Sequence, residues 1–289
     1  MRIIGLSERI KPIKVNQILV SLDNSTHSNA ALDAAVELAQ QYHASLKGVF
    51  IEDINLLNLA QMPFCQEIGE HTAKIREITT DALTRGIYVQ SRKVIKTFRN
   101  KTDPIGIDAV FLVLRGDVYK TIEKESQSSD LIVIGKTGTN PVRGRRIGST
   151  ARALIKSHTK PLLLIEEKTR LGHPIIVLYH QTALGTCCLE TGRELLNPDE
   201  TLIVLLKQDD PEIFSNNAAN LTQWANTFKI KISIQGYKEH TIHRLFQKLN
   251  ELEKGLLIMS RDAGIATQKI SQEFIDYVRL PILLIRTCI

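Results

Sequence analysis

The sequence is poor in aromatic residues, which make up 5% of its 289 positions, and it contains no long hydrophobic run. No apolar stretch approaches the ~20 residues that a membrane helix requires, so we expect no membrane segment. Because aromatics are scarce and no basic stripe runs between them, nucleic-acid binding is disfavoured. Residues 1–11 also lack the apolar core and cleavage site of a secretory signal. These absences favour a cytoplasmic globular protein.

Cysteine and histidine provide no metal-binding pattern. The four cysteines show no CxxC spacing, and the eight histidines form no HExxH pair. We therefore expect the cysteines to act as small apolar residues in a reducing compartment, and we expect no metal site.

The positive charge is concentrated in the first half of the chain. Residues 1–168 carry 24 Lys and Arg against 18 Asp and Glu, a surplus of six, whereas residues 169–289 carry 13 of each. Attraction to an anionic ligand bound by the first half would explain this asymmetry.

Short apolar runs alternate with helical segments along the whole chain, which is typical of an α/β fold with parallel strands. The expected strands of the first half are 18–22, 46–51, 109–114, 131–134 and 161–165. The first expected helix of this half begins near Ser25. Further helices are expected at 67–98, with an interruption at Gly86, at 118–126, and after Thr150. The second half repeats this order, with strands at 175–179, 201–206, 230–235, 256–259 and 282–285. Its helices are expected near 183–196, 217–228, 240–253 and 265–278.

Both halves end in the same pattern, Pro-Leu-Leu-Leu-Ile at 161–165 and Pro-Ile-Leu-Leu-Ile at 281–285. We interpret the chain as an internal duplication with a junction in the charged stretch 166–173. The predicted fold is two tandem, open, five-stranded parallel-sheet (Rossmann-like) domains with helices on both faces. The predicted domains are residues 1–168 and 169–289.

A glycine-rich loop follows the strand at 131–134 and leads into a helix. It contains Gly135, Gly138, Gly148, Ser149 and Thr150, and five basic residues lie between positions 136 and 152. Glycines allow the backbone to approach a ligand closely, and a helix N-terminus attracts anions. We therefore expect phosphate binding here, with Lys136, Arg143, Arg145 and Arg146 as candidate cations; an ordinary β–α turn is the alternative.

The second half lacks this loop. Aligning the fourth strands places Ser260 at the position of Gly135 and Ala263 at the position of Gly138. His180 likewise replaces Asp23, the residue that follows the first strand. We expect only the first half to hold a nucleotide.

The spacing Gly135-x2-Gly138-x9-Gly148-Ser149 resembles the ATP-binding signature of universal stress proteins. The strand end at Asp23 and the runs 130–135 and 162–165 match as well. The resemblance covers most of residues 15–166, and the whole chain is similar to a tandem member of that family.

The resemblance implies a role for each matching residue. The three glycines, Ser149 and Thr150 would surround the triphosphate, with Arg145 among the loop cations. Asp23 would bind the ribose hydroxyls or lie near magnesium. Phe50 would lie beside the adenine, and Ser21 and Ile134 complete the expected site. The implied cofactor is ATP, with or without magnesium.

The function that we expect is nucleotide-dependent regulation in a stress response rather than catalysis, although slow ATP hydrolysis stays open. The sequence has no GxxxxGK[ST] motif for efficient phosphoryl transfer. The expected partners are an adenine nucleotide, an unidentified protein, and either a second chain or the other half of the same chain in a pseudo-dimer. The alternatives are a nucleotide-free interaction scaffold and an adenylyl-transferring enzyme.

Overall fold

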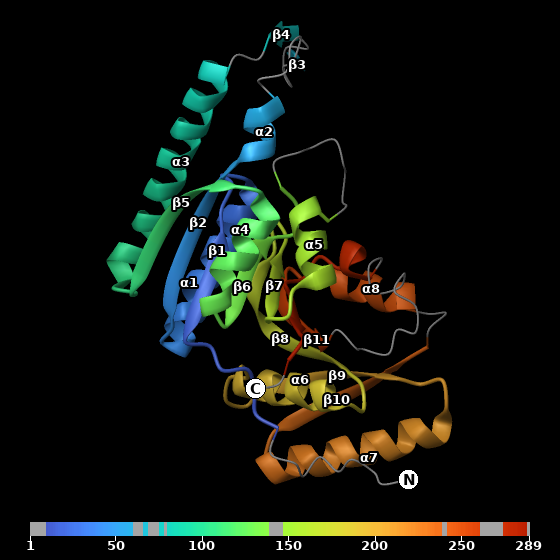
Figure 1. Cartoon of the computed structure of the whole chain (residues 1–289). Coiled ribbons are helices and arrows are strands. Elements are labelled where there is room, and N and C mark those ends of the chain that lie inside the picture. The colour runs from blue at the N-terminus through green and yellow to red at the C-terminus, as the bar shows by residue number, and fades with distance from the viewer. Residues whose placement is uncertain are drawn as a thin grey trace.

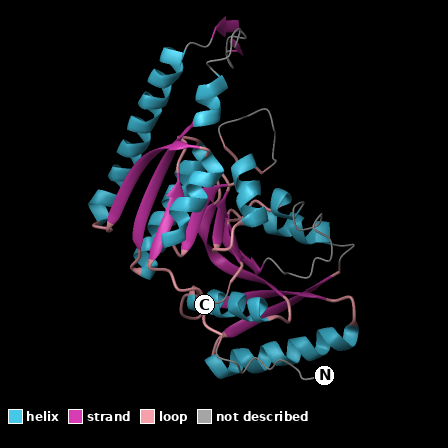
Figure 2. Ribbon diagram, in the orientation of Figure 1, coloured by secondary structure: helices cyan, strands magenta, loops and turns pink. Residues whose placement is uncertain are grey.

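The computed structural model describes residues 10–59, 80–138, 147–238, 242–260 and 274–287, with the backbone alone for 242, 243 and 246, and also the backbone alone of 66–68 and 75–77. Figure 1 shows the path of the chain, and Figure 2 shows the strands as one continuous twisted sheet between helices.

The first half supplies five strands to this sheet. They are β1 (Gln17–Ser21), β2 (Ser45–Asp53), β5 (Ala109–Gly116), β6 (Leu131–Gly135) and β7 (Leu162–Ile165). The helices of this half are α1 (Thr26–Tyr42), α2 (Ile54–Leu59), α3 (Thr80–Thr102), α4 (Val118–Glu125) and α5 (Ser149–Ser157). Two 3₁₀ turns, η1 (Asp103–Ile105) and η2 (Ser126–Ser128), follow α3 and α4, and β3 (Gln66–Ile68) pairs with β4 (Ile75–Glu77) in a separate small sheet.

The second half supplies five more strands. They are β8 (Arg170–Tyr179), β9 (Thr201–Lys207), β10 (Lys231–Tyr237), β11 (Lys254–Ser260) and β12 (Ile282–Ile285). Its helices are α6 (Ala183–Glu194), α7 (Pro211–Phe228) and α8 (Ile242–Asn250), and residues 274–277 form a further helical turn.

The strand order of the main sheet is β10-β9-β8-β11-β12-β7-β6-β1-β2-β5. Each half therefore uses the same internal order, third-second-first-fourth-fifth, and the two fifth strands meet at the centre. β7 and β12 pair antiparallel, with Leu164 opposite Ile282 and Leu162 opposite Leu284, whereas the other strand pairs of this sheet are parallel. The α/β fold is confirmed, but the two five-stranded sheets join edge to edge into a single sheet.

The reason for this junction lies in the composition of the edge strands. All four residues of β7 and all four of β12 are buried. An apolar strand that is covered on both faces is stable only if its edge is also paired, because unpaired backbone groups are costly when buried. Each fifth strand supplies the missing neighbour for the other, so the two halves form an intramolecular pair.

Helices cover the two faces of the sheet in the same way in both halves. Buried residues of α1, α3, α6 and α7 belong to one apolar core, and those of α4, α5 and α8 belong to the other. Both cores run through the two halves without a break, and α3 lies beside β5 at the edge (Figure 1). The residues before β1 also contact the second half, because the Ile13 N–H donates to Thr191 Oγ1 of α6 at 3.2 Å.

The prediction of a long helix over 67–98 was wrong at its start. The described part of this region contains β3 and β4, and α3 begins only at Thr80. The prediction depended on the helical spacing of Ile75, Ile78, Ala82 and Leu83. Ala82 and Leu83 do lie in α3, whereas Ile75 lies in β4. Among the described helices of the second half, α7 also begins earlier than predicted, because Asp210 caps it and Pro211 occupies its first turn.

Gly86 does not interrupt α3, which continues to Thr102. A Cβ added at this exposed position would meet no atom within 4 Å. We expect Gly86→Ala to raise the free energy of unfolding by about 0.5–1 kcal/mol, since glycine loses more backbone entropy than alanine in a helix. Urea denaturation measures the change, and a lower midpoint for the variant would contradict it.

No helix of the described residues is long and apolar enough to cross a membrane.

Candidate functional site

The candidate site lies at the carboxyl ends of β1 and β6, two neighbouring strands in the interior of the sheet. These strands are adjacent and parallel, with Ser21 opposite Ile134. The residues that follow them, Asp23 and the loop beginning at Gly135, are therefore brought together, as expected for the carboxyl ends of an α/β sheet. Asp23 Oδ2 lies 3.4 Å from the position of a Cβ on Gly138.

A tight turn holds Asp23 in this position. Its Oδ1 accepts a hydrogen bond from the Ser25 N–H at 3.0 Å, and Asn24 between them has a φ of 66°. Ser25 in turn caps α1 by accepting from the Ser28 N–H at 3.0 Å. The predicted cap at Ser25 is confirmed, and the Asp23 carboxylate stabilises the turn with one oxygen while the other faces the glycine loop.

The three glycines of the loop have different surroundings. A Cβ on Gly135 would lie 2.9 Å from His27 Cβ and 3.1 Å from the Ser28 nitrogen, so β6 ends directly against the first turn of α1. A Cβ on Gly148 would lie 3.4 Å from the Gly138 nitrogen, which is an ordinary van der Waals distance. Gly138 itself is exposed, and its nearest neighbour, Asp23 Oδ2, is also at 3.4 Å. Close packing therefore explains Gly135 alone, and both other glycines have room for a side chain.

The loop closes at the start of α5. The Gly148 N–H donates to the Lys136 carbonyl at 2.9 Å, which joins the two ends of the loop. Gly148 is the N-cap residue of α5 in an extended conformation, and no side chain caps this helix. The first-turn N–H groups at Ser149 and Thr150 have no acceptor within an α-helix, so this terminus is suited to an anion.

Lys136 does not face this space. It is 2% exposed, and its Nζ donates to the Val278 carbonyl and lies 3.5 Å from Glu166 Oε2. Burial lowers the pKa of Lys136, and the Glu166 carboxylate opposes that shift. The expectation that Lys136 could neutralise phosphates is therefore wrong. Arg143, Arg145 and Arg146, the other candidate cations, lie outside the described residues.

The remaining predicted residues lie on the strands behind the loop. Ile134 and Phe50 are both buried at 4% exposure, in opposite cores, and Ser21 at the end of β1 is half-buried. β2 ends at Asp53, two residues later than the predicted strand 46–51, so Phe50 lies three residues before the strand end. Its contact with adenine stays a prediction.

His27 was not predicted as part of the site, but it links the site to the junction between the halves. Its Nδ1 accepts a hydrogen bond from the Glu167 N–H at 2.8 Å. The contact of Lys136 with Val278, 142 positions away, was not predicted either. No local pattern reveals contacts over such a separation.

The corresponding edge of the second half is built differently. A Cβ on Gly185 would lie 1.9 Å from the His180 carbonyl oxygen, so α6 begins directly over the residue that replaces Asp23. Burial, with the charge of Lys207, lowers the pKa of His180 to about 4. Ser260, at the position of Gly135, is fully buried. A neutral histidine thus occupies the position that carries a carboxylate in the first half.

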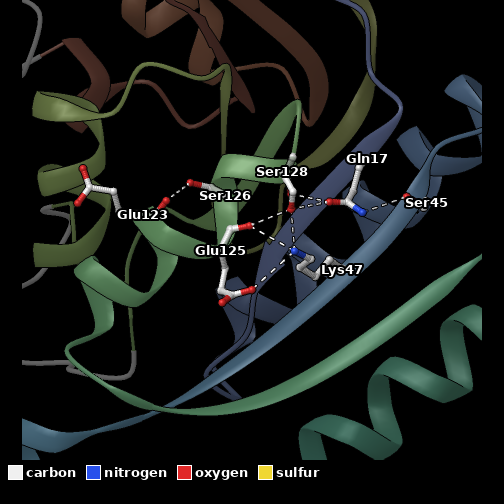
Figure 3. A network of polar contacts seen from close by, with 8 residues as sticks. Gln17, Ser45, Lys47, Glu123, Glu125, Ser126 and Ser128 are labelled. Carbon is white, nitrogen blue, oxygen red and sulfur yellow. Dashed lines mark hydrogen bonds and ion pairs between the residues drawn. The ribbon is translucent and has the colours of Figure 1, made fainter.

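At the opposite ends of the strands of the first half, polar contacts join α4 to the sheet. Figure 3 shows Lys47 of β2, whose Nζ donates to Ser128 Oγ at 2.9 Å and lies 3.6 Å from Glu125 Oε2. Ser128 Oγ donates further to Gln17 at 3.1 Å. These bonds anchor the end of α4 to β1 and β2. Within the described part of the chain, no three or more His, Cys, Asp or Glu residues are grouped to hold a metal ion.

Comparisons with known proteins agree with this architecture. The model of the universal stress protein family matches residues 14–166. Universal stress protein YxiE of Bacillus subtilis (strain 168) is 25% identical over 152 residues, which cover 52% of this chain and 98% of YxiE.

Two solved structures are similar over both halves. A universal stress protein from Archaeoglobus fulgidus DSM 4304 has a TM-score of 0.71 at 13% identity and covers 96% of this chain and 98% of its own. A functionally unknown protein, PA1789, from Pseudomonas aeruginosa PAO1 has a TM-score of 0.62 at 13% identity, with 94% and 92% covered. At these identities the likeness shows the fold alone. Since the family model matches more than half of its length, the chain belongs to the universal stress protein family.

Proposed function

We propose that this protein is a regulatory, stress-response nucleotide-binding protein whose first half, residues 1–168, binds ATP or a related adenine nucleotide. Residues 169–289 form a second domain that keeps the fold without the nucleotide loop. The proposal rests on one observation. The Asp23 carboxylate lies close to Gly138, next to the N-terminus of α5, which no side chain caps. A carboxylate for ribose hydroxyls and free amides for phosphates are then adjacent.

The phosphates would bind backbone N–H groups between Gly138 and Thr150 rather than the side chain of Lys136. Lys136 is engaged with Glu166 and Val278, so the N–H groups at the start of α5 provide the positive potential. The spacing of the glycines, which resembles the family's ATP-binding signature, supports the same ligand. Arg145, magnesium and the adenine contact of Phe50 remain parts of the proposal.

We expect the purified protein to bind ATP in the presence of magnesium. A ligand that binds only the folded state stabilises it by RT ln(1 + [L]/Kd), about 2.7 kcal/mol when the ligand is at 100 Kd. Thermal unfolding across an ATP titration measures this shift, and mass spectrometry of natively purified protein identifies any nucleotide that is retained. An unchanged unfolding temperature at millimolar ATP would refute the proposal.

Binding without efficient hydrolysis is part of the proposal. Asp23 holds the turn through Oδ1 and offers Oδ2 to the ribose, so we assign it no role in activating water. Efficient phosphoryl transfer requires a group that orients water and a cation that stabilises the transition state. We therefore propose that nucleotide occupancy, rather than turnover, is the output of the protein.

A nucleotide-free interaction scaffold is the second candidate, and one surface feature favours it. Ile54, Leu56 and Leu59 on α2 are each at least 40% exposed, which places apolar side chains on the surface above the ends of β2 and β5. Apolar groups of this kind are typical of protein contact sites. The ATP titration separates the two candidates, because a scaffold would show no stabilisation.

A further inference from the structure

Both described ends of the glycine loop are bonded to one segment of the second half. At the first end, Lys136 Nζ donates to the carbonyl of Val278. At the other end, the Ile147 N–H donates to Asp276 Oδ1 at 3.0 Å, across 129 positions of sequence. Asp276 and Val278 lie in and just after the helical turn that precedes β12. A single turn of one half thus holds the loop of the other half on both sides.

The helix that the loop leads into is also held from the second half. Arg286, which follows β12, donates from Nη1 to the carbonyl of His158 at the C-terminal end of α5. Phe274 and Val278 of this segment are fully buried, and they belong to the same apolar core as Leu154 of α5. Packed interiors resist small displacements, so the position of α5 depends on this turn.

Lys136 lies among opposite charges. It is buried beside Glu166, and Asp276 adds a further attractive carboxylate near it. A buried ammonium group is retained only if it is paired and hydrogen-bonded. The lysine offsets one of these two negative charges.

We infer that the second half acts as a positioning partner for the nucleotide site of the first half. Asp276 and the carbonyl of Val278 hold the loop ends and the start of α5 in the geometry that binds phosphate. Asp276 is a positioning residue and does not touch the nucleotide. This inference rests on the proposed function. Because linkage is reciprocal, bound nucleotide also stabilises the turn at 274–278.

The test compares three variants of the full chain. Asp276→Ala removes the acceptor of the Ile147 N–H, and we expect it to weaken ATP binding about tenfold. Asp276→Asn keeps an oxygen acceptor, so we expect it to restore most of this affinity. The matched control is Asp210→Ala, because Asp210 also accepts backbone N–H bonds in the second half but at the start of α7. Isothermal titration with ATP and magnesium measures each affinity.

A second measurement needs no nucleotide. We expect the amide of Ile147 to exchange with deuterium faster in Asp276→Ala than in the wild type or in Asp210→Ala. Circular dichroism confirms that each variant is folded. If the wild type binds no ATP, the proposed function fails, and amide exchange still decides whether the turn holds the loop.

The inference is overturned by either of two results. One is an Ile147 amide that exchanges at the wild-type rate in Asp276→Ala. The other is a wild type that binds ATP while Asp276→Ala binds it as tightly as Asp210→Ala does, which leaves the proposed function intact.

Discussion

Gly138→Trp is expected to weaken ATP binding by about 100-fold or more, equivalent to about 2.8 kcal/mol. Gly138 is exposed, and a Cβ there would lie 3.4 Å from Asp23 Oδ2. An indole at this position would fill the space between Asp23 and the start of α5, where we place the ribose and phosphates. Isothermal titration with ATP and magnesium measures the loss.

The matched control for this variant is Gly86→Trp. Gly86 is also an exposed glycine, but it lies on α3 and has no atom within 4 Å of an added Cβ. We expect this variant to bind ATP as the wild type does. If Gly138→Trp retained wild-type affinity while remaining folded, the nucleotide would have to bind elsewhere.

Gly185→Ala is expected to lower the free energy of unfolding by about 3 kcal/mol, the upper range for inserting a methyl group into a closely packed site. The added Cβ would lie 1.9 Å from the His180 carbonyl oxygen and 2.9 Å from its carbon. These are backbone atoms, so relief requires that α6 or the end of β8 move. Chemical denaturation followed by circular dichroism measures the change.

The same substitution at Gly86 is the control, since there it is expected to stabilise α3 slightly. The two variants differ by one methyl group from the same parent and are expected to have effects of opposite sign. A Gly185→Ala protein as stable as the wild type would show that α6 does not begin against His180. It would also weaken the contrast between this site and the proposed nucleotide site of the first half.

Most of the fold could be predicted because buried parallel strands are short, apolar and flanked by breaks. The apolar run 131–134 and the two similar segments 161–165 and 281–285 match β6, β7 and β12 within one residue. The helix cap at Ser25 could also be predicted, because a serine side chain can accept a hydrogen bond from a first-turn N–H, and Ser25 is the N-cap residue of α1. The helix predicted over 67–98 is confirmed from Thr80 onward and is wrong at β3 and β4, because the helical spacing was extended too far toward the N-terminus.

The sequence indicated which residues form the candidate site, but only part of their arrangement in space could be predicted. Glycine spacing identified the loop, and the strand order brought Asp23 to it. Lys136 was predicted to face phosphates because the sequence around it is typical of a solvated phosphate-binding loop. In the structure its Nζ instead donates to the carbonyl of Val278 in the other half. The bond between Ile147 and Asp276 carries no local signal for the same reason.

By itself, the sequence determined the alternation of strands and helices, the repeated order of the two halves and the absence of the Gly-x2-Gly-x9-Gly-Ser spacing from residues 169–289. These properties depend on residues close together in the chain, where periodicity, capping and backbone freedom act. Only the tertiary structure decided that β7 and β12 pair into one sheet and that the turn at 274–278 holds the loop of the other half. Both depend on burying apolar edges and a lysine charge, which requires groups more than a hundred positions apart to meet.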